Sequence, residues 1–140
     1  MRLIFTLTIC VFFHLTLSAQ TAILNIKITN IQPLSGKVMV ALFNSKETYF
    51  NIDQMYAGRE IPADSSIVTC VFQDIPNGTY AITIYHDADE NGEMNRSWIG
   101  MPKEGYAFSN NFTSAIRPAS FNDAAFLLQG DTTLEIKMNY

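Results

Sequence analysis

Apolar and polar residues alternate along most of the chain, which is the pattern of β-strands with one buried face and one wet face. The clearest run lies at the carboxy terminus, where TLEIKMNY alternates without a break. The strand-like segments are 24–29, 37–43, 67–72, 79–85, 106–108, 125–128 and 133–140. Helical periodicity is nearly absent, so the pattern predicts an all-β protein.

Turn residues between these runs predict how the strands are joined. The sequence PLSG at 33–36 separates the first two runs, and DIPNG at 74–78 separates the next two. Each of these two pairs is expected to form a β-hairpin. Residues 44–64 and 96–123 form longer connections, and mixed apolar spacing within 46–56 predicts one short surface helix. The expected fold is an antiparallel Greek-key β-sandwich of about seven strands, with a small barrel as the alternative.

The amino-terminal residues predict export from the cell. Arg2 precedes an apolar run at 3–17 and the small pair Ser18-Ala19, which is typical of a secretory signal peptide. The apolar run is too short to span a bilayer comfortably, and polar residues follow it. We therefore expect a cleaved signal peptide at 1–19 and a single domain at 20–140, located in the periplasm or outside the cell. This domain is expected to hold no integral membrane segment; a retained amino-terminal anchor helix is the alternative.

Charge and cysteine content exclude several classes of protein. The formal net charge is −4, and loss of Arg2 with the signal peptide makes it −5. The basic residues are scattered singly, so the sequence has no footprint for nucleic acid and no basic run that would hold it to anionic lipid. Cys10 would leave with the signal peptide, and Cys70 alone cannot form an intramolecular disulfide.

Oxygen-bearing side chains recur at every second position in the segment HDADENGEMN, residues 86–95. Alternate residues of a calcium-binding turn point inward, and Gly92 permits a sharp turn. The candidate Ca²⁺ ligands are Asp87, Asp89, Asn91, Glu93, Asn95 and, on the following segment, Glu104. The loop is not an EF-hand, because Trp98 occupies the twelfth position, where a bidentate carboxylate is needed. The alternative is an Asx-rich turn without metal, whose side chains bond to backbone amides.

Catalytic motifs are absent from the sequence, and no catalytic residue is predicted. His86 follows a strand and precedes Asp87, but no nucleophile accompanies this pair, because Cys70 falls in register with core residues. We expect His86 to orient the loop by hydrogen bonding. Candidate ligand-binding groups are His86, Trp98, Tyr106, Ser109, Asn110 and Asn111. The alternative is that the aromatic side chains anchor this long connection while the amides satisfy its backbone.

Four stretches carry a family resemblance: DIPNGTYAI at 74–82, HDADENG at 86–92, GMPKEGYAFSNN at 100–111 and PASFNDAAF at 118–126. Together they resemble a secreted bacterial family known as domain of unknown function 2141, over residues 22–140. The segment ending in PNGTY is also similar to transthyretin-like and carboxypeptidase-regulatory-like sandwiches. The resemblance implies a transthyretin- or immunoglobulin-like sandwich and an exported location, and it implies no activity.

Three classes of function fit these features. The first is a non-catalytic β-sandwich module with a calcium-stabilised loop that binds an unknown protein or carbohydrate of the cell envelope. The second is a metal-dependent or carboxylate acid–base hydrolase that uses Asp87, Asp89 and Glu104. The third is a structural subunit of an envelope assembly, for which an exposed sheet edge would serve. We favour the first.

Overall fold

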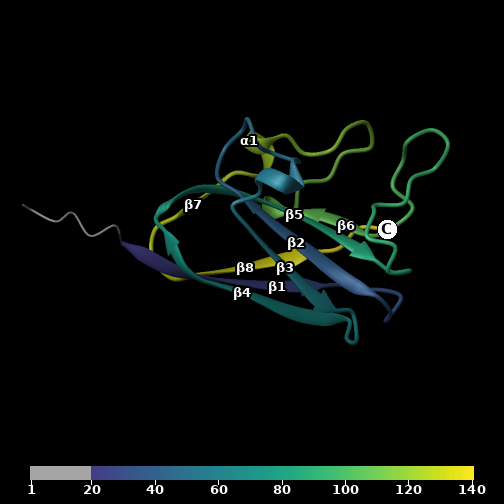
Figure 1. The fold of residues 1–140 in the computed structure, drawn as a ribbon, viewed down its shortest axis with the longest axis horizontal. Coiled ribbons are helices and arrows are strands. Elements are labelled where there is room, and N and C mark those ends of the chain that lie inside the picture. Colours follow the sequence, from purple (N-terminus) through teal and green to yellow (C-terminus); the bar gives the residue numbers. More distant parts are fainter. Residues whose placement is uncertain (1–19) are drawn as a thin grey trace, which may run out of the picture.

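The computed structural model describes residues 20–140, which form two β-sheets packed face to face (Figure 1). The first sheet has the strand order β4-β1-β8, with β4 at Ile67–Pro76, β1 at Thr21–Thr29 and β8 at Thr132–Lys137. The second sheet has the order β3-β2-β5-β6, made of Ala57–Pro62, Lys37–Phe43, Gly78–Asp87 and Tyr106–Phe108, and β7 at Phe126–Leu128 also pairs with β5. The predicted signal peptide lies outside the described residues and stays a prediction.

Inward-facing apolar side chains of both sheets form the main core. Strand β1 shows the alternation most plainly, because Leu24, Ile26 and Ile28 are completely buried while the residues between them reach the surface. Strand β5 contributes Ile82 and Ile84 from the opposite sheet. The predicted all-β sandwich is therefore confirmed, with eight strands where about seven were expected, and one strand pair, β1 with β8, is parallel.

Both predicted hairpins are wrong, because each of these turns carries the chain from one sheet to the other. Strand β1 pairs with β4 and β8, whereas β2 pairs with β3 and β5. Strands β4 and β5 likewise lie in different sheets, and the Tyr80 hydroxyl closes their turn by donating to the Pro76 carbonyl at 2.8 Å. A turn signal between two alternating runs marks a reversal of the chain, and the reversal here crosses the core.

Two elements depart from the sequence prediction. Strand β3 lies within 44–64, which was expected to be a connection, and the predicted surface helix at 46–56 is a series of turns with one 3₁₀ turn, η1, at Ile52–Gln54. Strand β3 escaped detection because Gly58, Arg59 and Glu60 interrupt the apolar alternation of an edge strand. None of the helices in the described part is long and apolar enough to cross a membrane.

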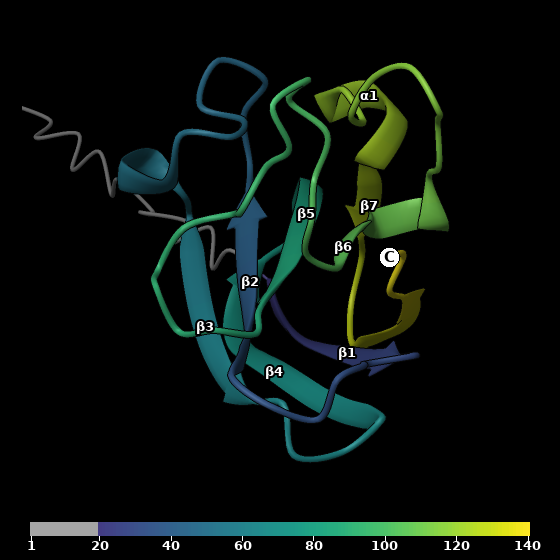
Figure 2. The ribbon, with the colours of Figure 1, turned by 90° about the vertical axis from the view of Figure 1, so that its right-hand side faces the viewer.

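The long connections pack on the outer face of the second sheet. Figure 2 shows α1, Phe121–Ala124, above β7, and the helix also contacts β5. The Tyr49 ring makes edge contacts with Phe43 of β2 and Phe121 of α1, and thereby joins the 44–56 connection to the helix. Strand β5 is thus covered on both faces, and its carboxy-terminal end is the place where the candidate site begins.

Candidate metal and ligand site

Strand β5 delivers its last two residues to opposite faces of the sheet. His86 continues the inward series of Ile82 and Ile84, and Asp87 points to the outer face. Both side chains are buried, with 0% and 3% exposure, because His86 lies on the core side of the sheet and the loop at 88–104 folds back over Asp87. The strand therefore separates the two neighbours of the predicted His-Asp pair.

Asp87 holds the sharp turn of this loop through backbone amides. Its Oδ1 accepts from Asn91 N at 3.1 Å and its Oδ2 accepts from Gly92 N at 2.9 Å. Gly92 has φ +81°, a left-handed conformation that glycine adopts without a Cβ penalty. The carboxylate thus organises the turn directly, as an Asx-rich turn would.

Glu104 fastens the returning arm of the loop. Its Oε1 accepts from Ala88 N at 3.1 Å and its Oε2 accepts from Asn95 N at 2.9 Å. The side chain is 9% exposed. Glu104 therefore bridges the beginning and the middle of the loop from the segment that leads into β6.

Three carboxylates meet at the base of the loop. Oxygen atoms of Asp87, Asp89 and Glu104 all lie within 4.8 Å of one another, and we call this group the acidic triad. Within the described residues no lysine or arginine forms an ion pair with any of the three. Each carboxylate oxygen that accepts one amide keeps a second lone pair, so the triad retains the capacity to ligate a cation. Burying carboxylates together without a positive charge is unfavourable, and a cation would offset that cost.

Asp89 is the exposed member of the triad, and side-chain amides surround it. Its Oδ2 accepts from Asn95 Nδ2 at 2.8 Å and from Asn91 Nδ2 at 3.1 Å. The hydrogen bond from Asn95 holds the pKa of the Asp89 carboxyl below its usual range. The amide oxygens of Asn91 and Asn95 are engaged inside the loop, with Glu93 N and Asn91 Nδ2 respectively.

The structure thus brings three of the six candidate metal ligands together as carboxylates and places two more, Asn91 and Asn95, as hydrogen-bond donors to one of them. Glu93 is exposed and does not belong to the triad. Direct ligation by either asparagine requires its amide to turn its oxygen toward the triad.

His86 is buried inside a polar network rather than in an open site. Its Nε2 lies 2.7 Å from the carbonyl oxygen of Ser35, and its Nδ1 lies 2.9 Å from the Tyr140 hydroxyl. The carbonyl can only accept, which assigns the proton to Nε2 and makes Nδ1 the acceptor from Tyr140. The same hydroxyl accepts from Gln32 N at 2.9 Å. His86 therefore joins β5, the 32–35 turn and the last residue of the chain.

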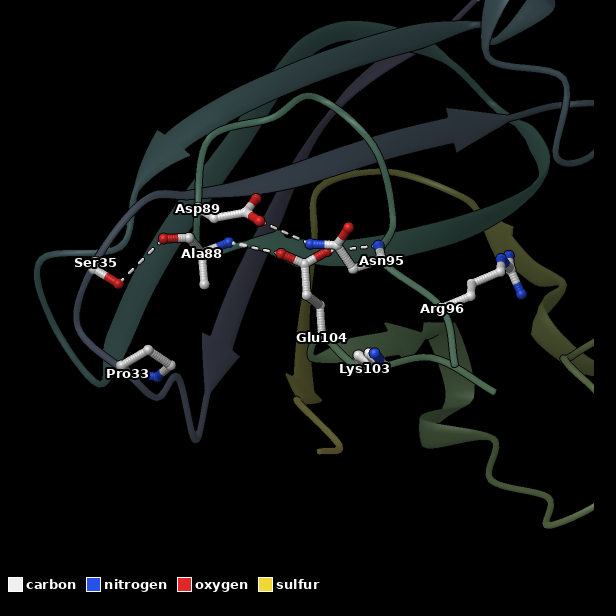
Figure 3. Close-up of a pocket in the computed structure, with 8 residues that line it drawn as sticks. All are labelled: Pro33, Ser35, Ala88, Asp89, Asn95, Arg96, Lys103 and Glu104. Atoms are coloured by element: carbon white, nitrogen blue, oxygen red, sulfur yellow. Dashed lines mark hydrogen bonds between the residues drawn. The ribbon is translucent and has the colours of Figure 1, made fainter. Parts of the chain in front are cut away.

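An open pocket of about 420 Å³ lies beside the triad (Figure 3). Its lining residues are Pro33, Ser35, Ala88, Asp89, Asn95, Arg96, Lys103 and Glu104. Figure 3 shows Asp89, Asn95 and Glu104 turned toward one another, while the Arg96 side chain extends away from them. The pocket therefore combines carboxylate, amide, hydroxyl and cationic groups, which together suit a polar ligand.

The structure separates the candidate ligand-binding residues. Trp98 is 97% exposed, whereas Ser109 is fully buried and donates to Ala124 O while accepting from Ile82 N at 2.9 Å. Asn110 Nδ2 donates to the carbonyls of Asp123 and Ala125, and Asn111 bonds to the β8 backbone through both ends of its amide. These contacts are those of the alternative in which the amides satisfy the backbone of the connection. Tyr106 is half-buried in β6.

Sequence reasoning missed the residues that complete the pocket. Ser35 comes from the 32–35 turn, and no local pattern connects it with a loop more than fifty residues away. Arg96 and Lys103 carried a usable signal, since they stand on either side of the turn that contains Trp98. Tyr140 carried no signal in the sequence, because its hydroxyl contacts His86 only in the folded chain.

Comparison with known protein families gives a match over most of the chain. A bacterial family described as an uncharacterized protein conserved in bacteria, DUF2141, matches residues 26–136. No curated protein matches the chain. No solved structure matches it.

Proposed function

The chain belongs to the bacterial DUF2141 family, and from this premise we propose that it is an exported, non-catalytic β-sandwich module. Its loop at 87–104 is stabilised by calcium, and the module binds a carbohydrate or protein of the cell envelope. The observation that carries the proposal is the acidic triad, in which two carboxylates are buried and none has a basic partner within residues 20–140.

Calcium is the cation that the chemistry of the triad favours. All three groups are hard oxygen donors, and sulfur or imidazole ligands are not part of the cluster. A flexible loop with exposed Asp89 leaves positions for water, which suits the irregular coordination of calcium better than the strict octahedron of Mg²⁺.

A binding role is favoured over catalysis because the buried carboxylates are already engaged. Both oxygens of Asp87 and both oxygens of Glu104 accept backbone amides of the loop. Moving a proton or attacking a substrate with these groups would disturb the hydrogen bonds that shape the loop. The adjacent pocket, with its amide, hydroxyl and charged groups, supports a hydroxyl-rich ligand such as a carbohydrate.

Thermal unfolding of residues 20–140 in excess calcium and in chelator tests the metal. At calcium about 100-fold above its dissociation constant, binding stabilises the folded state by about 2.7 kcal/mol. We therefore expect the Tm to rise by several degrees and to saturate. An unchanged Tm in the wild-type protein would overturn the calcium proposal and leave the loop as a metal-free turn.

Asp89→Asn is the informative variant because Asp89 is exposed and its loss should leave the fold intact. We expect this variant to lose most of the calcium response. Asp64→Asn is the matched control, since Asp64 is an exposed carboxylate outside the triad. An Asp89→Asn protein that responds as strongly as the control would show that calcium binds elsewhere.

The ligand is tested by following backbone amide resonances while saccharides of the cell envelope are added. Shifts that cluster at Ala88, Asn95 and Lys103 would place a saccharide in the pocket. Saturating saccharide without shifts at these residues would contradict the carbohydrate part of the proposal and leave a protein ligand.

A further inference from the structure

Residues 95–103 form a protruding turn that we call the Trp98 hairpin. Its arms are joined by hydrogen bonds from Lys103 N to Asn95 O at 2.8 Å and from Ser97 N to Met101 O at 2.7 Å. Gly100 N closes the tip by donating to Ser97 O at 2.8 Å, and the Ser97 hydroxyl accepts from Met101 N at 3.1 Å. In Figure 1 this hairpin projects from the body of the molecule beyond the end of β5.

The tip of the Trp98 hairpin carries its apolar side chains into solvent. Trp98 is 97% exposed, Ile99 63% and Met101 52%. A single exposed apolar residue is ordinary, but three at one convex tip expose surface that water solvates poorly. Because the tip protrudes, it cannot enclose a small ligand. It is suited instead to insertion into a larger partner, such as a protein pocket or a lipid surface.

Cationic side chains flank this tip. Arg96 stands on one arm and Lys103 on the other, and neither forms an ion pair within the described residues. Although the basic residues are scattered along the sequence, the hairpin places these two on either side of one apolar group. An apolar tip with basic residues at its base suits a lipid surface. The apolar side chains can enter the boundary of the acyl chains while the basic side chains contact the headgroup phosphates.

A second apolar tip points to the same side of the molecule. Ile116 is 91% exposed in the connection between η2, Ser109–Asn111, and α1. Arg117 follows it and forms an ion pair with Asp123 at 2.6 Å. Figures 1 and 2 both show this connection and the Trp98 hairpin rising on the side of the molecule where α1 lies. A protein partner would need two separate matching pockets to accept both tips, whereas a bilayer accepts them without shape complementarity.

We propose that this side of the molecule docks on a phosphate-bearing lipid surface by inserting the Trp98 hairpin, with Arg96 and Lys103 at the level of the headgroup phosphates. Tryptophan is favoured at that depth because its ring is apolar and its indole N–H remains near water. The internal hydrogen bonds of the hairpin reduce the number of backbone groups that lose water on insertion. This docking is independent of the calcium proposal, although a cation at the acidic triad would reduce the negative charge beside the hairpin.

The chain provides its own reporter for the test, because Trp98 is its only tryptophan. Residues 20–140 contain both sheets and the complete core, so this segment is used once its cooperative melting has been confirmed. Vesicles of equal parts phosphatidylethanolamine and phosphatidylglycerol are added in calcium and, separately, in chelator. We expect Trp98 emission to move to shorter wavelength and to be quenched by lipids brominated in the acyl chains. No shift and no quenching in either condition would overturn the proposal.

Variants then separate insertion from general adhesion. Ile99→Ser with Met101→Ser keeps the reporter and should weaken vesicle partitioning at least about tenfold. Its control is Ile67→Ser, which removes an exposed apolar side chain from β4 in the other sheet and should change nothing. Equal losses in the two proteins would overturn the role of the tip.

Charge is tested in the same way. Arg96→Gln with Lys103→Gln should weaken partitioning about 30-fold, because each basic residue near an anionic surface contributes about 1 kcal/mol. The control is Lys27→Gln with Lys137→Gln, which removes the same charge from β1 and β8 in the other sheet. A hairpin variant that binds vesicles as well as its control would contradict the placement of Arg96 and Lys103 at the phosphates, and capture of Trp98 by a protein pocket would then be the better account.

Discussion

At the scale of single residues, one hydroxyl group, that of Tyr140, joins two segments that lie far apart in the sequence. Its hydroxyl donates to His86 Nδ1 and accepts from Gln32 N, so it serves two polar groups that have no other partner in this network. Loss of this hydroxyl is costly mainly at His86, which is fully buried and would be left without a partner at Nδ1, whereas Gln32 is exposed and water can replace the hydroxyl at its N–H.

We therefore expect Tyr140→Phe to lower the free energy of unfolding by about 1–3 kcal/mol. Urea denaturation of wild-type and variant proteins measures the difference. Tyr106→Phe is the matched control, because the Tyr106 hydroxyl makes no hydrogen bond within residues 20–140, and it should cost only a few tenths of a kcal/mol. Equal costs for the two variants would mean that the network around His86 contributes nothing to stability.

Individual residues also show how much of the candidate site could be predicted from the sequence. The spacing of Asp87 and Asp89 indicated a common centre because a turn brings alternate side chains together, and this local rule needs no knowledge of the fold. Glu104 was within reach because it lies on the next segment that returns to the sheet. The partners of His86 could not be predicted in this way, because Ser35 and Tyr140 approach it only when elements far apart in the chain pack together.

At the scale of elements, alternation located seven of the eight strands because a strand between core and solvent must alternate. The same pattern is silent about pairing. A turn such as PNG permits a tight reversal within a sheet or a crossing between sheets, and the choice depends on which neighbour buries the apolar face. Here the crossing buries β1 against β2 across the core instead of beside it.

The first crossing depends on Gly36. This residue has φ +70°, and a Cβ there would overlap the carbonyl oxygen of Asp87 at the end of β5. The connection between β1 and β2 can therefore contact β5 this closely only with glycine at position 36. Because β5 also carries Asp87, the position of this connection affects the geometry of the acidic triad.

Gly36→Ala is expected to lower stability by roughly 3 kcal/mol or more, because backbone overlap is added to the left-handed cost of about 1–2 kcal/mol. Gly130→Ala measures the left-handed conformational cost alone, because Gly130 has φ +85° and the added methyl group would meet open space. Thermal melting in calcium and in chelator checks both variants, and Gly36→Ala should also blunt the calcium response. A loss no larger than that of Gly130→Ala would show that the crossing shifts away from β5 without cost.

At the scale of the whole molecule, the sandwich and the loop at 87–104 are held by different forces. The sandwich rests on apolar burial between two sheets, which does not involve the carboxylates. The loop rests on a few amide-to-carboxylate hydrogen bonds around like charges. Such regions open locally at a lower free energy than the core, so calcium should act on the loop first.

Hydrogen exchange measured residue by residue distinguishes local from global stabilisation. The amides that bond to triad carboxylates belong to Ala88, Asn91, Gly92 and Asn95. With calcium bound, we expect these four to exchange at least about tenfold more slowly, because opening the loop then requires release of the cation. Under conditions where core amides exchange through local opening, the exchange rates of the Ile26 and Ile84 amides should not change. Uniform slowing across both sheets would instead mean that the cation stabilises the fold as a whole, and the triad would then be part of the folding core rather than the organiser of one loop.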